Sequence, residues 1–141
     1  MIPRFRAWYV LAEEMIDEIL MISFVRKEII GKFSDGSTSV PLKFEDERNG
    51  EDVVLMQSTG LHDKNGKEIF EGDIVKRYRS PFFKAEWEYR IEIVIKEEAR
   101  LLLGRKYGKN FWTIPFHSPF AKSDLLEVIG NIYENKELLD A

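Results

Sequence analysis

The stretch Leu55-Met-Gln-Ser-Thr-Gly-Leu-His-Asp-Lys-Asn-Gly-Lys-Glu-Ile-Phe-Glu-Gly-Asp-Ile-Val75 decides the fold class, because apolar strand-like runs alternate in it with residues typical of tight turns. Residues 53–57 begin with four apolar side chains, two of them β-branched, which predicts a buried strand that Gly60 should end. Asp63-Lys64-Asn65-Gly66 then combines an Asp that can accept backbone N–H bonds with an Asn-Gly pair that tolerates positive φ. This combination predicts a hairpin turn.

The residues after that turn predict a second reversal of the chain. Residues 67–70 would form the short returning strand, and Glu71-Gly72-Asp73 would form the next turn. Residues 74–78 alternate in the manner of another strand. Two strand reversals in so short a stretch favour a mainly β protein.

Three segments of the chain, taken together, resemble the YopX-like family of phage and prophage proteins. They occur in the family's order and are Arg4-Phe5-Arg6-Ala7-Trp8, the stretch 55–75, and Glu127-Val-Ile-Gly-Asn-Ile-Tyr-Glu-Asn135. The resemblance implies a mainly β, multi-sheet meander with a small α contribution and a barrel-like C-terminal part. It also implies an oligomer encoded by a phage or prophage, and it implies no particular activity.

The sequence departs from the family pattern at three positions. Tyr9 stands where an acidic residue commonly follows the Trp, His62 where Lys is usual, and Lys136 where Pro is common before Glu137-Leu-Leu139. These departures leave the implied fold in place, but no family function is carried over to Tyr9 or His62.

Length and composition predict one domain that needs no disulfide or structural metal ion for its stability. A chain of 141 residues can bury roughly two thirds of its unfolded surface. We expect a single domain, with an N-terminal meander over about residues 1–52 and a barrel-like core over about 53–141. The absence of Cys excludes disulfides and thiolate metal sites. Because the chain shows neither a membrane-length apolar run nor the apolar core of a signal peptide, we expect a cytoplasmic protein of the host cell with no membrane partner.

Apolar runs in the N-terminal third predict a meander of strands. The runs are residues 5–10, 19–24, 28–33 and 40–44, with turn-forming residues at 34–37 and 45–50. Residues 12–20 stay open between a strand and a short helix, because Met15, Ile16, Ile19 and Leu20 also match helical spacing.

The most regular alternation lies at residues 87–95. Its odd-numbered residues would form the buried face of a strand, and Glu88, Arg90 and Glu92 its solvent face; the odd-numbered set is Trp87, Tyr89, Ile91, Ile93 and Ile95. The neighbouring elements would be strands at 101–103, 111–116 and 127–133, and one helical turn that starts at Asn135 and ends at Leu139.

Residues suited to a metal or cofactor site are scarce. The imidazoles are those of His62 and His117, and neither lies in a pattern with ligand spacing. Gly104 and Gly108 bracket three residues that form neither a P-loop nor a dinucleotide fingerprint. We therefore expect no metal and no cofactor.

Catalytic side chains are equally weakly indicated. Asp63 and Asp73 stand where Asx side chains cap turns, and Glu68 and Glu71 flank strand ends as solubilising charges. Ser118 lies beside His117 but belongs to no nucleophile-elbow motif. We expect no catalytic residue and no enzyme activity.

Three clusters combine cations with aromatic rings, as in many surfaces that bind single-stranded nucleic acid. They are Arg105, Lys106, Tyr107, Lys109 and Trp112 with Arg100 and Phe111; Lys76, Arg77, Tyr78 and Arg79; and Arg4, Arg6 and Trp8. The net charge is −4, from 21 Lys and Arg against 25 Asp and Glu, so only a local patch could attract a polyanion. Alternatively, Trp8, Trp87 and Trp112 anchor the core or an interface, and the cations solvate strand edges.

Two hypotheses of different classes follow. In the first, the chain is a non-enzymatic β protein that self-associates as a homo-oligomer, because open sheets leave edges to be covered, and that binds an unknown phage or host macromolecule. In the second, it is a nucleic-acid-binding small-barrel module that uses the tip at 105–112 and the strand at 76–79. The acidic total charge favours the first.

Overall fold

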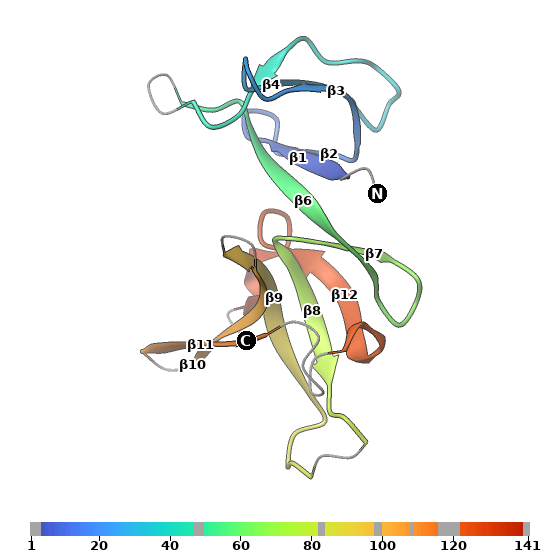
Figure 1. Cartoon of the computed structure of the whole chain (residues 1–141), viewed down its shortest axis with the longest axis vertical. Coiled ribbons are helices and arrows are strands. Elements are labelled where there is room, and N and C mark those ends of the chain that lie inside the picture. Colours follow the sequence, from blue (N-terminus) through green and yellow to red (C-terminus); the bar gives the residue numbers. More distant parts are fainter. Residues whose placement is uncertain are drawn as a thin grey trace. The chain divides into compact units, whose positions relative to one another are not determined.

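Residues 4–46, 50–81, 84–97, 100–107, 109–115 and 122–139 are described by a computed structural model of the protein. Within these residues the chain is mainly β, which confirms the predicted fold class, and its helical structure consists of 3-10 turns (Figure 1). The chain divides into two compact units, unit 1 over residues 1–58 and unit 2 over residues 59–141. Each unit has its own hydrophobic core.

Unit 1 contains two small antiparallel sheets. In the first, β1 (Phe5–Tyr9) pairs with β2 (Glu14–Ile16) on one side and with β6 (Val53–His62) on the other. In the second, β4 (Glu28–Lys32) lies between β3 (Glu18–Ser23) and β5 (Leu42–Lys43). The strands overlap the runs predicted at 5–10, 19–24, 28–33 and 40–44.

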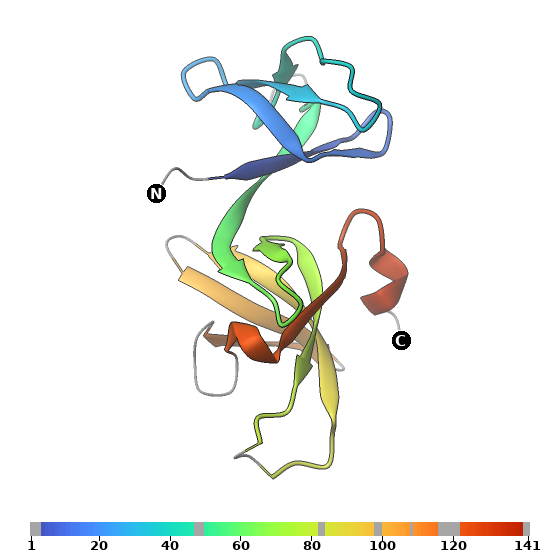
Figure 2. The same ribbon diagram turned by 90° about the vertical axis from the view of Figure 1, so that its right-hand side faces the viewer.

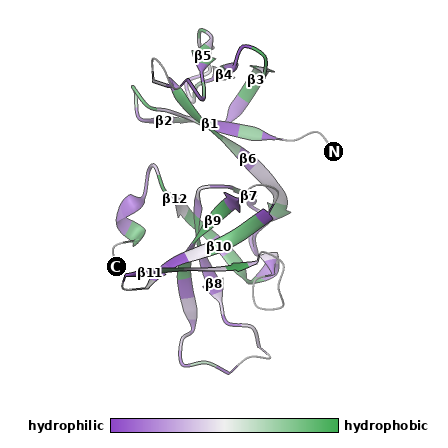
Figure 3. Cartoon of the chain, turned by 60° about the vertical axis from the view of Figure 1, so that its left-hand side comes forward, coloured by the Kyte–Doolittle hydropathy of each residue, from purple (hydrophilic) through white to green (hydrophobic). Residues whose placement is uncertain are grey.

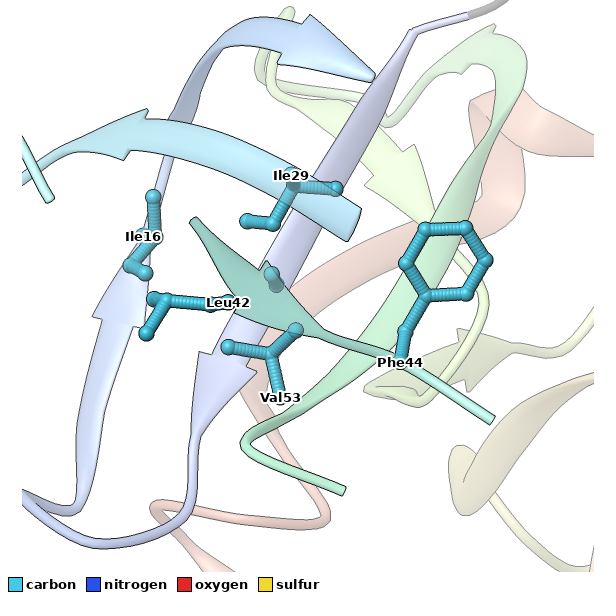
Figure 4. Packing of buried hydrophobic residues seen from close by; sticks show 6 residues of the cluster. Ile16, Ile29, Leu42, Phe44 and Val53 are labelled. Carbon is cyan, nitrogen blue, oxygen red and sulfur yellow. The ribbon is translucent and has the colours of Figure 1, made fainter. Parts of the chain in front are cut away.

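The core of unit 1 gathers apolar side chains from both sheets. Ile16, Ile29, Leu42 and Val53 lie close together in Figure 4, with Phe44 of the same cluster to one side, and each of the five is at most 4% exposed. Burial of such side chains stabilises a fold by about 1.5–3 kcal/mol each relative to full exposure. The small sheets are therefore held together by a shared apolar interior.

The helical alternative for residues 12–20 is wrong. Residues 14–16 form β2 and residues 18–23 form β3, so the chain passes from one sheet to the other at Asp17. Ile16 is fully buried whereas Leu20 is 50% exposed, so these apolar residues do not share one helical face. Pairing of β3 with β4 outweighs the helical spacing of the sequence.

Gly60 does not end its strand as the sequence predicted. β6 continues to His62, and Gly60 takes a φ of +79° inside it, a conformation open to glycine. β6 also neighbours β7 (Glu68–Phe70), where the Thr59 hydroxyl donates a hydrogen bond to the Ile69 carbonyl at 2.7 Å. Since the boundary between the units falls within β6, this strand contributes to both of them.

Unit 2 is built around a five-stranded antiparallel sheet that curls into a half-barrel. The strand order is β11 (Asn110–Pro115), β10 (Arg100–Tyr107), β9 (Tyr89–Glu97), β8 (Asp73–Tyr78) and β12 (Leu126–Asn131). The 3-10 turns η1 (Ser123–Leu125) and η2 (Lys136–Leu139) precede and follow β12 near the C-terminus (Figure 2), and η2 confirms the predicted final turn. The core of the unit consists of Ile69, Val75, Val94, Leu103 and Leu126, each at most 1% exposed.

The two faces of β9 are the reverse of the prediction. Glu92 and Val94 are 3% and 1% exposed, whereas Tyr89 is 41% exposed and Ile91 and Ile93 are only half-buried. The reason is that Glu92 forms a buried ion pair with Arg77 of β8, so charged residues belong to the inner face of the sheet. The regular apolar face is left partly open.

Candidate functional site

A trough of about 580 Å³ opens in unit 2 beside this partly open face. We call it the β9–β10 trough, and its lining residues are Trp87, Tyr89, Arg90, Ile91, Ile93, Gly104, Arg105, Lys106, Phe111, Lys136, Leu138 and Leu139. β10 contributes two kinds of residue along its length, since it changes from hydrophobic at 101–103 to hydrophilic at 105–106 (Figure 3). The trough therefore combines an apolar wall with a charged rim.

The apolar wall comes from two elements that are distant in sequence. Ile91 and Ile93 belong to β9, and Leu138 and Leu139 belong to η2, which packs against β9. All four side chains are half-buried. This wall can hold aliphatic groups of a ligand.

Gly104 shapes the floor of the trough. A Cβ at this position would lie 2.5 Å from Cζ of Phe111 and would also clash with Cδ1 of Ile95. Glycine therefore lets the Phe111 ring of β11 lie across β10. Phe111 is 54% exposed, so its ring is available to a ligand.

The charged groups of the lining have one sign. Arg90, Arg105, Lys106 and Lys136 line the trough, and no Asp or Glu is among the described lining residues. Clefts lined by one sign of charge concentrate ligands of the opposite sign. The trough thus favours anionic ligands, although the whole chain carries −4.

The aromatic side chains of the trough hold some of the nearby cations in place. The Arg90 guanidinium lies 4.5 Å from the centre of the Trp87 ring, and the Lys76 ammonium lies 4.5 Å from that of Tyr89. Such contacts contribute about 0.5–1 kcal/mol at exposed sites. They order the rim, and they occupy ring faces that a stacking base would need.

Arg77 lies beneath this rim and not on a surface. It is 5% exposed, and its Nε and Nη2 donate to Oε1 and Oε2 of Glu92 at 2.5 and 3.0 Å. Its guanidinium also lies 5.1 Å from the centre of the Trp87 ring. Arg77 therefore supports the position of Trp87 from inside the half-barrel.

The other residues predicted to form a binding surface are distributed unevenly. Arg105 and Lys106 line the trough, Lys109 is exposed in the turn before β11, and Trp112 is 60% exposed on β11. The backbone of Tyr107 belongs to β10, but its side chain is not among the described residues.

The two remaining clusters contribute little to the trough directly. Lys76 touches the lining residue Tyr89, while Arg79 is exposed beyond the end of β8. On β1, Arg6 and Trp8 are 7% and 9% exposed, so this pair is buried and is not part of an open surface.

Sequence reasoning missed the apolar half of the trough. Tyr89, Ile91 and Ile93 were predicted to be core residues, and Leu138 and Leu139 were predicted only as part of a terminal turn. The available signal was Leu101-Leu-Leu103, which supplies apolar groups to both faces of the sheet. The two faces of β9 are reversed because Glu92 has a buried partner in Arg77. The alternation of residues 87–95 does not reveal that partner.

The residues considered for chemistry lie apart from the trough or serve turns. Asp63 and Asp73 accept backbone hydrogen bonds in turns, as predicted, and His62 is exposed. His117 and Ser118 lie outside the described residues. Across the part of the chain that the structure describes, no group of three or more His, Cys, Asp or Glu is arranged to hold a metal ion, and no helix is long and apolar enough to cross a membrane.

Unit 1 exposes apolar side chains of its own. Leu11 and Val25 are 84% and 97% exposed in turns, and Leu20 and Met21 are about half exposed on β3. Scattered exposed apolar residues are common on protein surfaces. These residues therefore provide positions for control substitutions outside unit 2.

Comparison with known proteins gives matches over almost the whole length. The model of the family described as YopX protein matches residues 4–140. The crystal structure of protein EF1440 from Enterococcus faecalis is similar with a TM-score of 0.59 and 30% sequence identity, over 99% of this chain and 99% of that chain. No curated protein matches.

Proposed function

We propose that this chain, which belongs to the YopX family, is a non-enzymatic protein that self-associates and binds a macromolecular partner through unit 2. Self-association would use the edge of β11 that no other described strand covers, and partner binding the neighbouring β9–β10 trough. The observation that carries the proposal is the exposure of Phe111 and Trp112, 54% and 60%, on an edge strand.

The two edges of the half-barrel differ in how they are covered. At the β12 edge, Lys64 N–H donates to the Leu126 carbonyl at 2.9 Å, and Val128 N–H donates to Oδ2 of Asp63 at 2.8 Å. At the other edge, β11 has β10 as its only neighbour among the described strands. Residues 110–115 also contain no charge that would discourage pairing.

An uncharged edge strand of this kind can pair with its own copy. Two β11 strands related by a two-fold axis would continue the antiparallel sheet from one subunit into the next, and each would cover the other's edge. The Trp112 side chain, which is 60% exposed and does not line the trough, would then be buried at the contact, where such residues contribute most. We therefore expect a symmetric dimer or a larger assembly that contains this pair.

Light scattering after size exclusion tests self-association. The wild-type chain of 16.6 kDa should elute with at least about twice that mass at micromolar concentration. Trp112→Lys should shift it to the monomer mass, because the change removes a large apolar side chain and places a lysine from each copy at the paired edge. Leu11→Lys, at a residue 84% exposed in unit 1, is the matched control and should leave the mass unchanged. A monomeric wild type, or dissociation by the control alone, would refute the edge contact.

Nucleic-acid binding is the second candidate function, and the one-signed rim of the trough is the observation that favours it. The burial of Arg77 and the acidic total charge count against it. Fluorescence anisotropy with single-stranded and duplex oligonucleotides at two salt concentrations separates the candidates. Phosphate-driven binding should be strongest at low salt, and no binding there removes this candidate.

We propose that the protein acts in the cytoplasm of a host cell that carries a phage or prophage. The absence of Cys is compatible with a reducing compartment, and the resemblance of residues 4–8, 55–75 and 127–135 to phage and prophage proteins supports the origin. Expression of the gene during prophage induction, with the protein found in the cytoplasmic fraction, is the expected result.

A further inference from the structure

We propose that the β9–β10 trough binds a small amphipathic anion, an aliphatic chain that ends in a carboxylate. The aliphatic chain would lie along the apolar wall, and the carboxylate would pair with Lys106 and Lys136 at the rim. The inference goes beyond the proposed function, because binding of a small molecule depends neither on a macromolecular partner nor on pairing of β11 edges. A partner segment in the same trough would compete with this ligand.

The size and the lining of the trough are those of a small-molecule site. Its volume of about 580 Å³ lies within the range of roughly 300–1,000 Å³ that is typical of ligand pockets. Such pockets are lined mainly by hydrophobic and aromatic side chains, with a few polar groups that orient the ligand. Among the described lining residues, three aromatic and four aliphatic side chains accompany four cationic ones. The trough therefore suits a ligand that is mostly apolar and carries a negative charge.

The apolar wall has surface left for a ligand to cover. Ile91 and Ile93 of β9 and Leu138 and Leu139 of η2 line the trough, and all four are half-buried. Phe111 adds an aromatic ring that is 54% exposed. Because removal of apolar surface from water is favourable, an aliphatic chain along this wall would supply most of the binding free energy.

Hydrogen bonds fix the turn that leads from β12 into η2, so the η2 side of the wall is preformed. The Asn131 side-chain oxygen accepts from Glu134 N–H at 2.9 Å, and that of Asn135 accepts from Asn131 N–H at 3.2 Å. A Cβ at Gly130 would lie 2.5 Å from the Asn135 side-chain oxygen, so glycine lets this side chain fold back onto β12. Leu138 N–H then donates to the Asn135 carbonyl at 3.0 Å. A wall that is ordered in advance lowers the entropic cost of binding.

Two lysines provide the cationic groups that a carboxylate can reach. Lys106 of β10 and Lys136 of η2 both line the trough and are exposed. Arg90 and Arg105 line it too, but both already interact within the protein, Arg90 with the Trp87 ring at 4.5 Å. A lysine ammonium has three donors on a flexible stem, so two of them can converge on one carboxylate.

The lining favours an aliphatic anion over a nucleotide. The rings of Trp87 and Tyr89 each already carry a cation 4.5 Å from the ring centre. Stacking of a base needs free aromatic faces. An aliphatic chain needs only the wall, and its carboxylate needs only the rim.

Isothermal titration calorimetry of the full-length chain, with sodium decanoate as the probe, tests the proposal. Decanoate should bind at one site per chain with a negative heat-capacity change, which marks the burial of apolar surface. Decyltrimethylammonium has the same alkyl chain with a cationic head, and it should bind at least about tenfold more weakly because it meets the lysines of the rim. Both compounds are used below the concentrations at which they form micelles.

Matched substitutions locate the binding. Lys106→Glu and Lys136→Glu should each lower the affinity for decanoate about tenfold, because each places a carboxylate on the rim. Leu138→Ser/Leu139→Ser should lower it by a similar factor of about ten, because it removes the η2 side of the apolar wall. Lys122→Glu reverses an exposed lysine of unit 2 that does not line the trough, and it should leave the affinity unchanged.

A reversal of preference is the decisive result. In the double variant Lys106→Glu/Lys136→Glu, decyltrimethylammonium should bind more tightly than decanoate, which loss of structure alone would not produce. If the double serine variant does not fold, this reversal still decides the proposal, and its absence would overturn the site.

The remaining outcomes separate this inference from the proposed function. No binding of decanoate, or equal binding of the two compounds by the wild type, would refute the anion site, whatever light scattering shows. Trp112→Lys should bind decanoate as the wild type does, because Trp112 does not line the trough. Loss of self-association and loss of ligand binding are therefore distinct results.

Discussion

Asp63 illustrates how one side chain can join a local turn to a distant strand. Its Oδ1 accepts hydrogen bonds from Asn65 N–H and Lys67 N–H, both at 2.9 Å, and its Oδ2 accepts one from Val128 N–H at 2.8 Å. The first two contacts follow from the turn sequence and were predicted from it. The third joins residues 65 positions apart, and local patterns carry no information about such a partner.

Replacing this carboxylate should destabilise unit 2. Asp63→Ala leaves three backbone N–H groups without their acceptor at a residue that is 6% exposed, and we expect a loss of about 2–4 kcal/mol in the free energy of unfolding. Urea denaturation measures the loss. Asp35→Ala is the control, because Asp35 caps an exposed turn through Ser37 and should change the free energy of unfolding far less. Equal effects of the two changes would contradict a special role for Asp63.

The same contacts predict how stability depends on pH. Burial acts to raise the pKa of Asp63, but the N–H groups of Val128, Lys67 and Asn65, with the charge of Lys67, outweigh it and hold the pKa below its ordinary value. Because the pKa is lower in the folded than in the unfolded chain, the carboxylate stabilises the fold above pH about 4. This contribution is lost as the pH falls through the folded pKa. The difference in urea midpoint between wild type and Asp63→Ala should therefore narrow below pH about 4, and a difference that grows there would refute the assignment.

At the scale of single elements, β9 shows what alternation reveals and what it leaves open. The period of two at residues 87–95 correctly predicted a strand, since β9 spans Tyr89–Glu97. The alternation alone could not predict which face of β9 is buried, because each face contains residues that can be buried. Glu92 is buried only because Arg77, on another strand, satisfies both of its carboxylate oxygens.

The pairing of Arg77 with Glu92 gives a prediction for the β8–β9 pair. Arg77→Met leaves the Glu92 charge buried without this partner, and it should cost about 3–5 kcal/mol in the free energy of unfolding. The double change Arg77→Met/Glu92→Leu removes both charges and should recover most of that loss. A double-mutant cycle by urea denaturation measures the coupling. If the double variant were as unstable as the sum of the single variants, the two residues would not form one energetic unit.

The candidate site depends on the same distinction between local and long-range information. Arg105 and Lys106 were found from the sequence because charge and aromatic residues cluster there along the chain. The contribution of Leu138 and Leu139 depends on η2 folding back onto β9, and the openness of Ile91 and Ile93 depends on the inner ion pair. A site assembled from such distant residues becomes visible only once strand pairing is known.

At the scale of the whole molecule, β6 connects the two units through a single strand. Its residues 53–57 pair with β1 of unit 1, and it is also the neighbour of β7 in unit 2. The sequence predicted a strand at 53–57 but placed its end at Gly60, because glycine commonly interrupts strands. Here the positive φ of Gly60 lies within the strand, so that one strand serves both units.

This sharing predicts that the chain unfolds in one transition. Unit 1 spans residues 1–58, a length at which an isolated domain is only marginally stable, and it loses a strand partner whenever β6 is released. Scanning calorimetry should show a single peak with equal calorimetric and van't Hoff enthalpies. Val53→Ala opens a cavity at a residue that is fully buried in unit 1, and its cost of about 2 kcal/mol should lower the midpoint of the entire peak. Two peaks, of which Val53→Ala moves only one, would show instead that the units unfold independently and that β6 does not couple them.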